Sequence, residues 1–297
     1  VDVAIVLLLI GAVSKSALFP FHFWLPAAMA APTPVSAYLH AAAMVKAGIF
    51  LIGRMAPGFA DMPGWRETLI VLGILTMLLG GWQSLRQHDL KLVLAHGTVS
   101  QLGLLVVVIG FGTQETALAG LAMLTAHALA KAALFLVVGI VDHRTGTRDL
   151  RKLSGLGRQA PITAIAAALA IASMIGLPPT FGFVAKEAAF GAFVAAGESG
   201  MVWGWVALVG IAVGSMLTVA YGIRFWWSAF ARKRGVTPVA DVAEHPDMLA
   251  SPSILALTGV GLGLAAPLVD TWVAPYAATL PPVLDHPTHL ALWHGFT

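Results

Sequence analysis

Four lysines stand inside long apolar stretches of this chain: Lys15, Lys46, Lys131 and Lys186. An ammonium group at the centre of a membrane costs roughly 2.5–3.5 kcal/mol on insertion scales, so such residues are rarely kept without a role. Burial disfavours the charged form of a lysine, and a lysine poised in this way can release and regain a proton near neutral pH. The alternative is that each long side chain extends to the membrane surface.

Histidines accompany these lysines along the chain: His22, His40, His96 and His127. Histidine titrates near neutral pH without help from its surroundings. His127 precedes Lys131 by four residues, so both would lie on one face of a helix. His22 follows Lys15 by seven residues, which would place it on the same face of an unbroken helix. A satisfied buried imidazole is the simpler interpretation of any single histidine, whereas the pair of His127 and Lys131 favours proton transfer.

Carboxylates are scarce in the apolar stretches. Glu187, next to Lys186, is the clearest case, and Asp2 lies near the start of the first stretch. A site for a hard cation needs several oxygen ligands, whereas this chain offers amines and imidazoles. The chain also has no cysteine, no HExxH motif and no P-loop. We therefore expect a chain that moves protons and is not itself an enzyme, with no cofactor, no bound metal and no nucleic-acid partner.

The elements that must position these residues are long and apolar. The chain is 58% hydrophobic and only 10% charged, whereas a soluble globular protein carries about 25% charged residues. A membrane span needs about 20 mostly apolar residues, and the runs do not alternate in polarity as β-barrel strands do. The sequence predicts an all-α, multi-pass membrane protein of about eight spans. We place the spans near residues 1–23, 35–55, 66–84, 90–112, 115–141, 162–195, 201–230 and 252–274.

Arginines and lysines outside the spans are concentrated in alternate connections. They occur in the third connection around Arg86, in the fifth over residues 144–158 and in the seventh over residues 232–234. By the positive-inside rule these connections face the cytoplasm, so both ends of the chain are expected to face outside. The chain begins with Val1 and has no basic leader or cleavage site, so we interpret it as a piece of a longer polypeptide without a signal peptide.

Two spans are predicted to be broken. Pro20 and Pro26 follow Lys15, and the stretch GLPPTFGFVAKE at residues 176–187 contains Lys186. Proline removes a backbone donor, and at membrane depth the freed groups survive only inside protein or along a wet cavity. Paired broken helices are typical of transport sites between repeats. Two tolerated proline kinks are the alternative, but a lysine at each break favours a functional interpretation.

Four stretches carry a resemblance to a known family: KSALFPFHFWLPAAMAAPTPVSAYLHAAAMVKAGIFL, HDLKLVLAHGTVSQLG, HALAKAALFL and LPPTFGFVAKE. With them the chain resembles the antiporter-like subunits shared by Mrp-type Na⁺/H⁺ antiporters and respiratory complex I. The stretches MVKAGIFLIGRMAP and DHRTGTRDLRKLSGL favour the large A subunit of Mrp antiporters, and this chain resembles the C-terminal part of its antiporter module.

The resemblance implies two inverted five-helix repeats, each with a broken helix that carries a functional lysine. Residues 1–65 would be the end of the first repeat and residues 66–230 the second repeat. Residues 231–297 would hold a cytoplasmic loop, a final transmembrane helix and an outer tail. The family's acidic partner for Lys15 comes from an earlier helix, so this segment is not expected to be a complete transporter.

The resemblance also implies a function in the bacterial inner membrane. The segment would be the proton-translocating part of a Na⁺/H⁺ antiporter complex, with other subunits, membrane lipids, H⁺ and Na⁺ as partners. The alternatives are a proton-pumping subunit of complex I and a structural anchor for a soluble enzyme arm. The proton-transfer residues would be Lys15, His22, His40, Lys46, His127, Lys131, Lys186 and Glu187.

Overall fold

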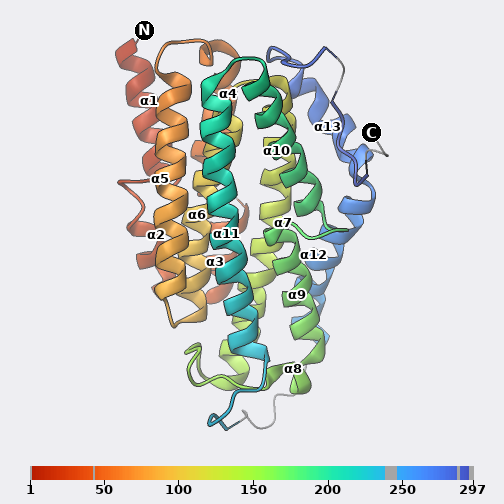
Figure 1. Ribbon diagram of the computed structural model, residues 1–297. Helices are drawn as coiled ribbons and strands as arrows, with labels where there is room; N and C mark the ends of the chain where they lie inside the picture. Colours follow the sequence, from red (N-terminus) through yellow and green to blue (C-terminus); the bar gives the residue numbers. More distant parts are fainter. Residues whose placement is uncertain (1, 43, 238–245, 286–287, 294–297) are drawn as a thin grey trace.

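The computed structural model describes residues 2–42, 44–237, 246–285 and 288–293. Within these ranges the regular structure is helical, and the long helices run side by side as one bundle (Figure 1). A helix satisfies its backbone hydrogen bonds internally, which is the condition for crossing a membrane. The predicted all-α, multi-pass membrane fold is confirmed.

The helices follow one another with short connections. In chain order they are α1 (Asp2–Lys15), α2 (Trp24–Ala27), the 3-10 turn η1 (Ala28–Ala30), α3 (Thr33–Ala37), the π-helical turn η2 (Tyr38–Ala42), α4 (Lys46–Phe59), α5 (Trp65–Arg86), α6 (Leu90–Gly110), α7 (Gln114–Thr145), α8 (Leu156–Gln159), α9 (Pro161–Ile175), α10 (Phe181–Glu198), α11 (Val202–Phe230), α12 (Pro246–Leu264) and α13 (Ala266–Ala277).

Both predicted breaks are present. The first predicted span divides after Lys15, where α1 ends, and it resumes as α2 at Trp24. The sixth divides into α9 and α10, with residues 176–180 between them. Because α1 ends at Lys15, the condition of an unbroken helix is not met, and the seven-residue spacing does not place Lys15 and His22 on one helix face.

Six helices of the described part are long and apolar enough to span a membrane: Thr33–Phe59, Trp65–Arg86, Leu90–Gly110, Gln114–Thr145, Val202–Phe230 and Pro246–Leu264. The two broken spans are built from shorter pieces, so the count of eight stays a prediction. The last predicted span, near residues 252–274, differs from the structure. It begins earlier, at Pro246, and it divides at Ala265 into α12 and α13.

The connections sort to the two ends of the bundle as the cation pattern predicts. The third, fifth and seventh connections lie at the lower end in Figure 1, which we call the cation-rich end (residues 86–90, 144–160 and 231–237). Arg148 ties the third connection to the end of α7, since it lies 3.1 Å from Asp89 and 3.5 Å from Asp142. The opposite end is the cation-poor end (residues 60–64, 111–113 and 199–201).

Helix α6 forms the centre of the bundle, because nearly all of its residues are buried. It packs closely on α5 where two glycines face each other's backbone. A Cβ atom at Gly73 would meet the Gly103 carbonyl oxygen, and one at Gly103 would meet the Gly73 carbonyl oxygen. Small residues allow such close approach between membrane helices. The buried His127 and Lys131 of α7 therefore lie beside a helix that is itself closely packed on α5.

Candidate functional site

Lys131 lies at the centre of the bundle and is fully buried. Its ammonium donates a hydrogen bond of 3.1 Å to the Leu94 carbonyl oxygen on α6. It also lies 6.0 Å from the centroid of the Tyr221 ring on α11. Residues of α6, α7 and α11 thus meet at the Lys131 amine. The predicted placement of Lys131 inside a span agrees with the structure, and the side chain does not extend to the surface.

Lys46 is the first residue of α4 and lies four residues after Ala42, the last residue of the π-helical turn η2. It is 7% exposed, and its ammonium donates to the Leu124 carbonyl oxygen on α7 at 3.3 Å. Leu124 lies three residues before His127 on the same helix. Both amines therefore donate to a backbone carbonyl of a neighbouring helix: Lys46 to α7 and Lys131 to α6.

Two buried histidines lie near these amines. His40, in η2, is 0% exposed and its ring centroid lies 4.8 Å from that of Phe135. His127 is 4% exposed, and Lys46, Lys131 and His40 all interact with it electrostatically. Within the described residues, neither ring nitrogen of either histidine has a hydrogen-bond partner. Buried polar atoms are usually satisfied by protein or water, so four unpartnered ring nitrogens are unusual for an ordinary core.

A set of uncharged polar side chains lies near Lys131 on α6 and α11. Gln101 donates to the Thr218 hydroxyl at 2.9 Å and to the Tyr221 hydroxyl at 3.3 Å. Tyr221 in turn donates to the Gly97 carbonyl oxygen at 3.4 Å. Sequence reasoning missed Tyr221, because one tyrosine in an apolar helix gives no sign of what it faces.

Lys186 lies at the second break, in α10, and is 9% exposed. Its ammonium donates to the Ile175 carbonyl oxygen at 3.0 Å, and Ile175 is the last residue of α9. The last carbonyls of a helix have no partner within the helix. The break therefore supplies the acceptor that holds this amine. Its neighbour Glu187 has an exposed side chain, so the predicted intramembrane carboxylate does not face the buried cluster.

The first break is held in place by three hydrogen bonds from its surroundings. The Ile49 amide of α4 donates to the Ser16 hydroxyl at 3.1 Å, and the Phe19 amide donates to the Thr76 hydroxyl at 3.0 Å. The Trp24 indole donates to the Ser14 carbonyl oxygen at 3.1 Å. Lys15 occupies the last turn of α1 with an exposed side chain, unlike the other three lysines.

His22 and His96 meet at a small polar cavity near the first break. The cavity measures about 380 Å³ and is also lined by Gln83, Arg86 and Gln87. The Nδ1 atoms of both histidines are buried and lack a partner among the described residues. The structure thus places His22 next to His96, close to the cation-rich end.

Lys91 is a buried lysine at the start of the predicted span near residues 90–112 that was not among the proton-transfer residues predicted from the sequence. It lies in the first turn of α6 and is 1% exposed. Its ammonium donates to the Met29 carbonyl oxygen at 3.0 Å and to the Ala31 carbonyl oxygen. It also interacts electrostatically with His40. The signal available in the sequence was the helix-capping Asp89 two residues earlier, which places Lys91 inside a helix.

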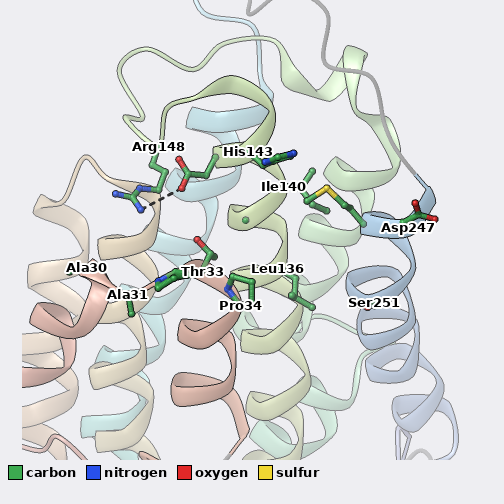
Figure 2. Close-up of a pocket in the computed structure, with 14 residues that line it drawn as sticks. Ala30, Ala31, Thr33, Pro34, Leu136, Ile140, His143, Arg148, Asp247 and Ser251 are labelled. Carbon is green, nitrogen blue, oxygen red and sulfur yellow. Dashed lines mark ion pairs between the residues drawn. The ribbon is translucent and has the colours of Figure 1, made fainter.

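A larger cavity opens at the cation-rich end between α3, α7 and α12 (Figure 2). It measures about 820 Å³. Thr33 and Pro34 at the start of α3 and Leu136 of α7 line its inner part, and Asp142 and Arg148 form an ion pair at its margin. His40 lies further along the chain segment that begins with α3, toward the centre of the bundle.

The fifth connection at this end is an ordered, charged loop. Arg151 donates to Asp149, with 2.8 Å between Nη2 and Oδ2, and these hydrogen bonds hold the pKa of Asp149 well below its usual range. Lys233 crosses from the seventh connection and donates to the carbonyl oxygens of Leu150 and Leu153. Arg151 and Lys233 therefore stabilise the structure of these loops.

Comparison with known proteins gives consistent matches. The family model described as NADH:quinone oxidoreductase/Mrp antiporter, TM matches residues 1–218. The chain is 40% identical to the A subunit of the Na⁺/H⁺ antiporter of Alkalihalophilus pseudofirmus, over 99% of this chain and 40% of that protein. It is also 40% identical to the A/B subunit of a probable K⁺/H⁺ antiporter of Rhizobium meliloti, over 98% of this chain and 29% of that protein. The chain thus spans well under half the length of these relatives.

Solved structures agree with the sequence matches. The Mrp complex of a Dietzia species contains a chain of TM-score 0.86 and 41% identity, covering 98% of this chain and 31% of that one. An archaeal membrane-bound sulfane sulfur reductase contains a chain of TM-score 0.78 at 24% identity, which shows a shared fold. This chain therefore belongs to the family of proton-antiporter membrane subunits shared by NADH:quinone oxidoreductases and Mrp antiporters.

Proposed function

We propose that the chain is the proton-translocating part of a monovalent cation/proton antiporter, with Na⁺ as the exchanged cation. It works with other subunits in a bacterial inner membrane and is a transporter, not an enzyme. Its nature as a piece of a large A-type subunit is supported by 40% identity to the matching Na⁺/H⁺ antiporter protein of Alkalihalophilus pseudofirmus. We propose the same division as above: the end of the first repeat in residues 1–65 and the second repeat in residues 66–230. A cytoplasmic loop, a final transmembrane helix and an outer tail would follow in residues 231–297.

The observation that carries the proposal is the buried cluster of Lys46, His127, Lys131 and His40. These groups come from α4, η2 and α7 and act on one another electrostatically. Burying amines, and burying imidazoles whose nitrogens have no hydrogen-bond partner, does not stabilise a folded core. A path for protons requires them, because each group can accept a proton and pass it on, directly or through water.

We infer a path that begins at the cavity of Figure 2 and at Lys91, next to the cation-rich end. A proton would reach an imidazole nitrogen of His40 through water and pass to the Lys131 amine. Like charges repel, so a protonated Lys131 favours release from the neighbouring His127. Lys186 would continue the path at the second break, where Glu187 lies next to it in α10, while Lys15 and His22 serve the first break.

The test uses the intact complex in inverted membrane vesicles. Lys15→Ala and Lys186→Ala are each expected to abolish the Na⁺-dependent dissipation of a pH gradient, because each removes a proton-carrying amine at a break. Lys152→Ala is the matched control, since Lys152 is exposed in the fifth connection. Wild-type exchange by both Lys15→Ala and Lys186→Ala would contradict the proposal.

The alternative is a proton-pumping subunit of complex I, which has the same fold. The relatives at about 40% identity named above are antiporter subunits, and this favours the antiporter. Proton pumping driven by quinone reduction, with no cation-dependent exchange, would decide for complex I. The structural-anchor alternative requires that replacement of every buried lysine leave transport unchanged.

A further inference from the structure

An apolar cavity of about 470 Å³ opens on the side of the bundle between α4, α6, α7 and α13. Its walls are Ile49, Phe50, Ile109, Leu121 and Leu124. Phe50 is 69% exposed, so the cavity opens sideways to the surroundings of the bundle. Its volume lies within the usual range for sites that bind small molecules, roughly 300–1,000 Å³. The proton path described above does not use this space.

One cation stands at the mouth of this cavity. Arg54, on α4, lines the cavity and is exposed, and it takes part in no ion pair within the described residues. Tyr276, on α13, lies beside it, interacts with it electrostatically and donates a hydrogen bond to the Gly53 carbonyl oxygen. Arg54 lies toward the cation-poor end, where α4 approaches its last turn.

We propose that this cavity binds one acyl chain of an anionic phospholipid, with the phosphate of its headgroup on Arg54. The apolar walls match a hydrocarbon chain, and the unpaired guanidinium matches a phosphate, which it can bind with two parallel hydrogen bonds. Tyr276 suits the boundary between the apolar walls and the charged headgroup, since its ring is apolar and its hydroxyl is polar. A zwitterionic lipid offers the same acyl chains and the same phosphate, but its ammonium group would be repelled by Arg54, so the charge of Arg54 favours an anionic headgroup.

The bound chain has a consequence for Lys46. Leu124 lines the inner part of the cavity, and its carbonyl oxygen accepts the hydrogen bond of the Lys46 ammonium. A hydrocarbon chain in this space keeps water from reaching that amine from the cation-poor side. The lipid therefore acts as a seal against proton leak beside the path. This consequence rests on the proposed function, whereas the binding of the lipid does not.

The binding test uses the intact complex in nanodiscs and native mass spectrometry. The probes are phosphatidylglycerol and phosphatidylcholine with identical acyl chains. We expect preferential retention of phosphatidylglycerol and a loss of about fivefold of that preference in Arg54→Gln, which corresponds to one cationic contact. Arg54→Lys should keep most of the preference. Arg234→Gln is the control, because Arg234 is exposed at the cation-rich end.

A second variant tests the cavity itself. Leu121→Trp fills the space between α4 and α7 and should lower retention of both lipids while Arg54 remains in place. Equal retention of the two lipids by the wild type, or an unchanged preference in Arg54→Gln, would overturn the proposal. Unchanged retention in Leu121→Trp would also overturn it, because the acyl chain would then lie elsewhere.

The seal is tested separately by the proton leak of vesicles in the absence of Na⁺. Arg54→Gln should increase this leak, and a higher content of phosphatidylglycerol should reduce it again, because a site weakened about fivefold refills by mass action. Na⁺-dependent exchange should persist. If the lipid binds as expected but the leak is unchanged, the seal is contradicted and the binding site stands. If the Lys15 and Lys186 variants transport normally, the proposed function fails while the lipid-binding result is unaffected.

Discussion

The ammonium of Lys186 lies 3.0 Å from the carbonyl oxygen of Ile175, the residue at which α9 ends. Lys46 and Lys131 are held in the same manner, by the carbonyl oxygens of Leu124 and Leu94. Among the described residues, none of these three amines lies within ion-pair distance of a carboxylate. A carboxylate partner would be left as an unpaired buried charge whenever the lysine lost its proton, which is strongly unfavourable. A carbonyl partner accepts a hydrogen bond from either form.

This arrangement predicts that an added carboxylate should trap Lys131 in its charged form. Thr98 is buried and shares the Leu94 carbonyl oxygen with Lys131, so its side chain lies nearby. Thr98→Asp should slow Na⁺-dependent proton transport by the intact complex at least tenfold, because the buried ion pair must separate in each cycle. The isosteric Thr98→Asn is the control and should transport much faster. Equal rates for the two variants would argue against charge release at Lys131.

The close packing at the second break gives a stability prediction. A Cβ atom at Gly182 would meet the Ser173 carbonyl group and hydroxyl, whereas one at Gly191 meets nothing within 4 Å. Gly182→Val should lower the stability of the complex by about 1–3 kcal/mol, the usual cost of overpacking. Gly191→Val on the same helix should cost far less. Thermal unfolding of the purified complex measures both, and equal midpoints would show that α9 and α10 are not in close contact.

His40 and His127 should act as one unit in proton transfer. Both are buried, and His40 interacts electrostatically with His127. His40→Ala and His127→Ala should each reduce the initial rate of transport, and the double variant should lose much less than the sum of the two effects on a free-energy scale. Residues in one network typically show coupling of roughly 0.5–3 kcal/mol. Strictly additive effects in the double-mutant cycle would indicate separate roles.

Glu115 should hold the chain after α13 against the start of α7. Its Oε1 atom accepts hydrogen bonds from the amides of Val283 at 2.8 Å and Leu284 at 3.1 Å. Hydrogen bonds to charged groups contribute about 1.5–3 kcal/mol. Glu115→Ala should therefore accelerate hydrogen exchange at these two amides at least tenfold. Glu198→Ala, an exposed glutamate at the cation-poor end, is the control. Unchanged exchange in Glu115→Ala would show that other contacts hold this segment.

The features that the sequence predicted well are those that depend on neighbours along the chain. The apolar runs predicted the bundle, and the proline pairs predicted both breaks. The four-residue spacing predicted that His127 and Lys131 share a face of α7. Each rests on local backbone chemistry or helix periodicity, which the sequence displays directly.

The features that the sequence did not predict depend on contacts between distant segments. Lys91 is 1% exposed because α6 meets the end of η1, which lies about sixty residues earlier in the chain. Tyr221 and Glu115 likewise owe their positions to other helices or to the tail. Lys15 and Glu187 belong to apolar stretches, yet their side chains are exposed, because burial depends on which helix face meets a neighbour. No spacing rule supplies that information.

The central claim is that protons pass through the buried amines, with Lys131 at the centre of the path. The most direct test is the initial rate of Na⁺-dependent dissipation of a pH gradient by the assembled complex carrying Lys131→Met, compared with wild type and with the exposed-site variant Lys152→Met. Methionine keeps an unbranched side chain that is one heavy atom shorter, and it has no group that can carry a proton. The account predicts a rate at the background of vesicles without the complex for Lys131→Met and a wild-type rate for Lys152→Met. A wild-type rate for Lys131→Met would contradict it.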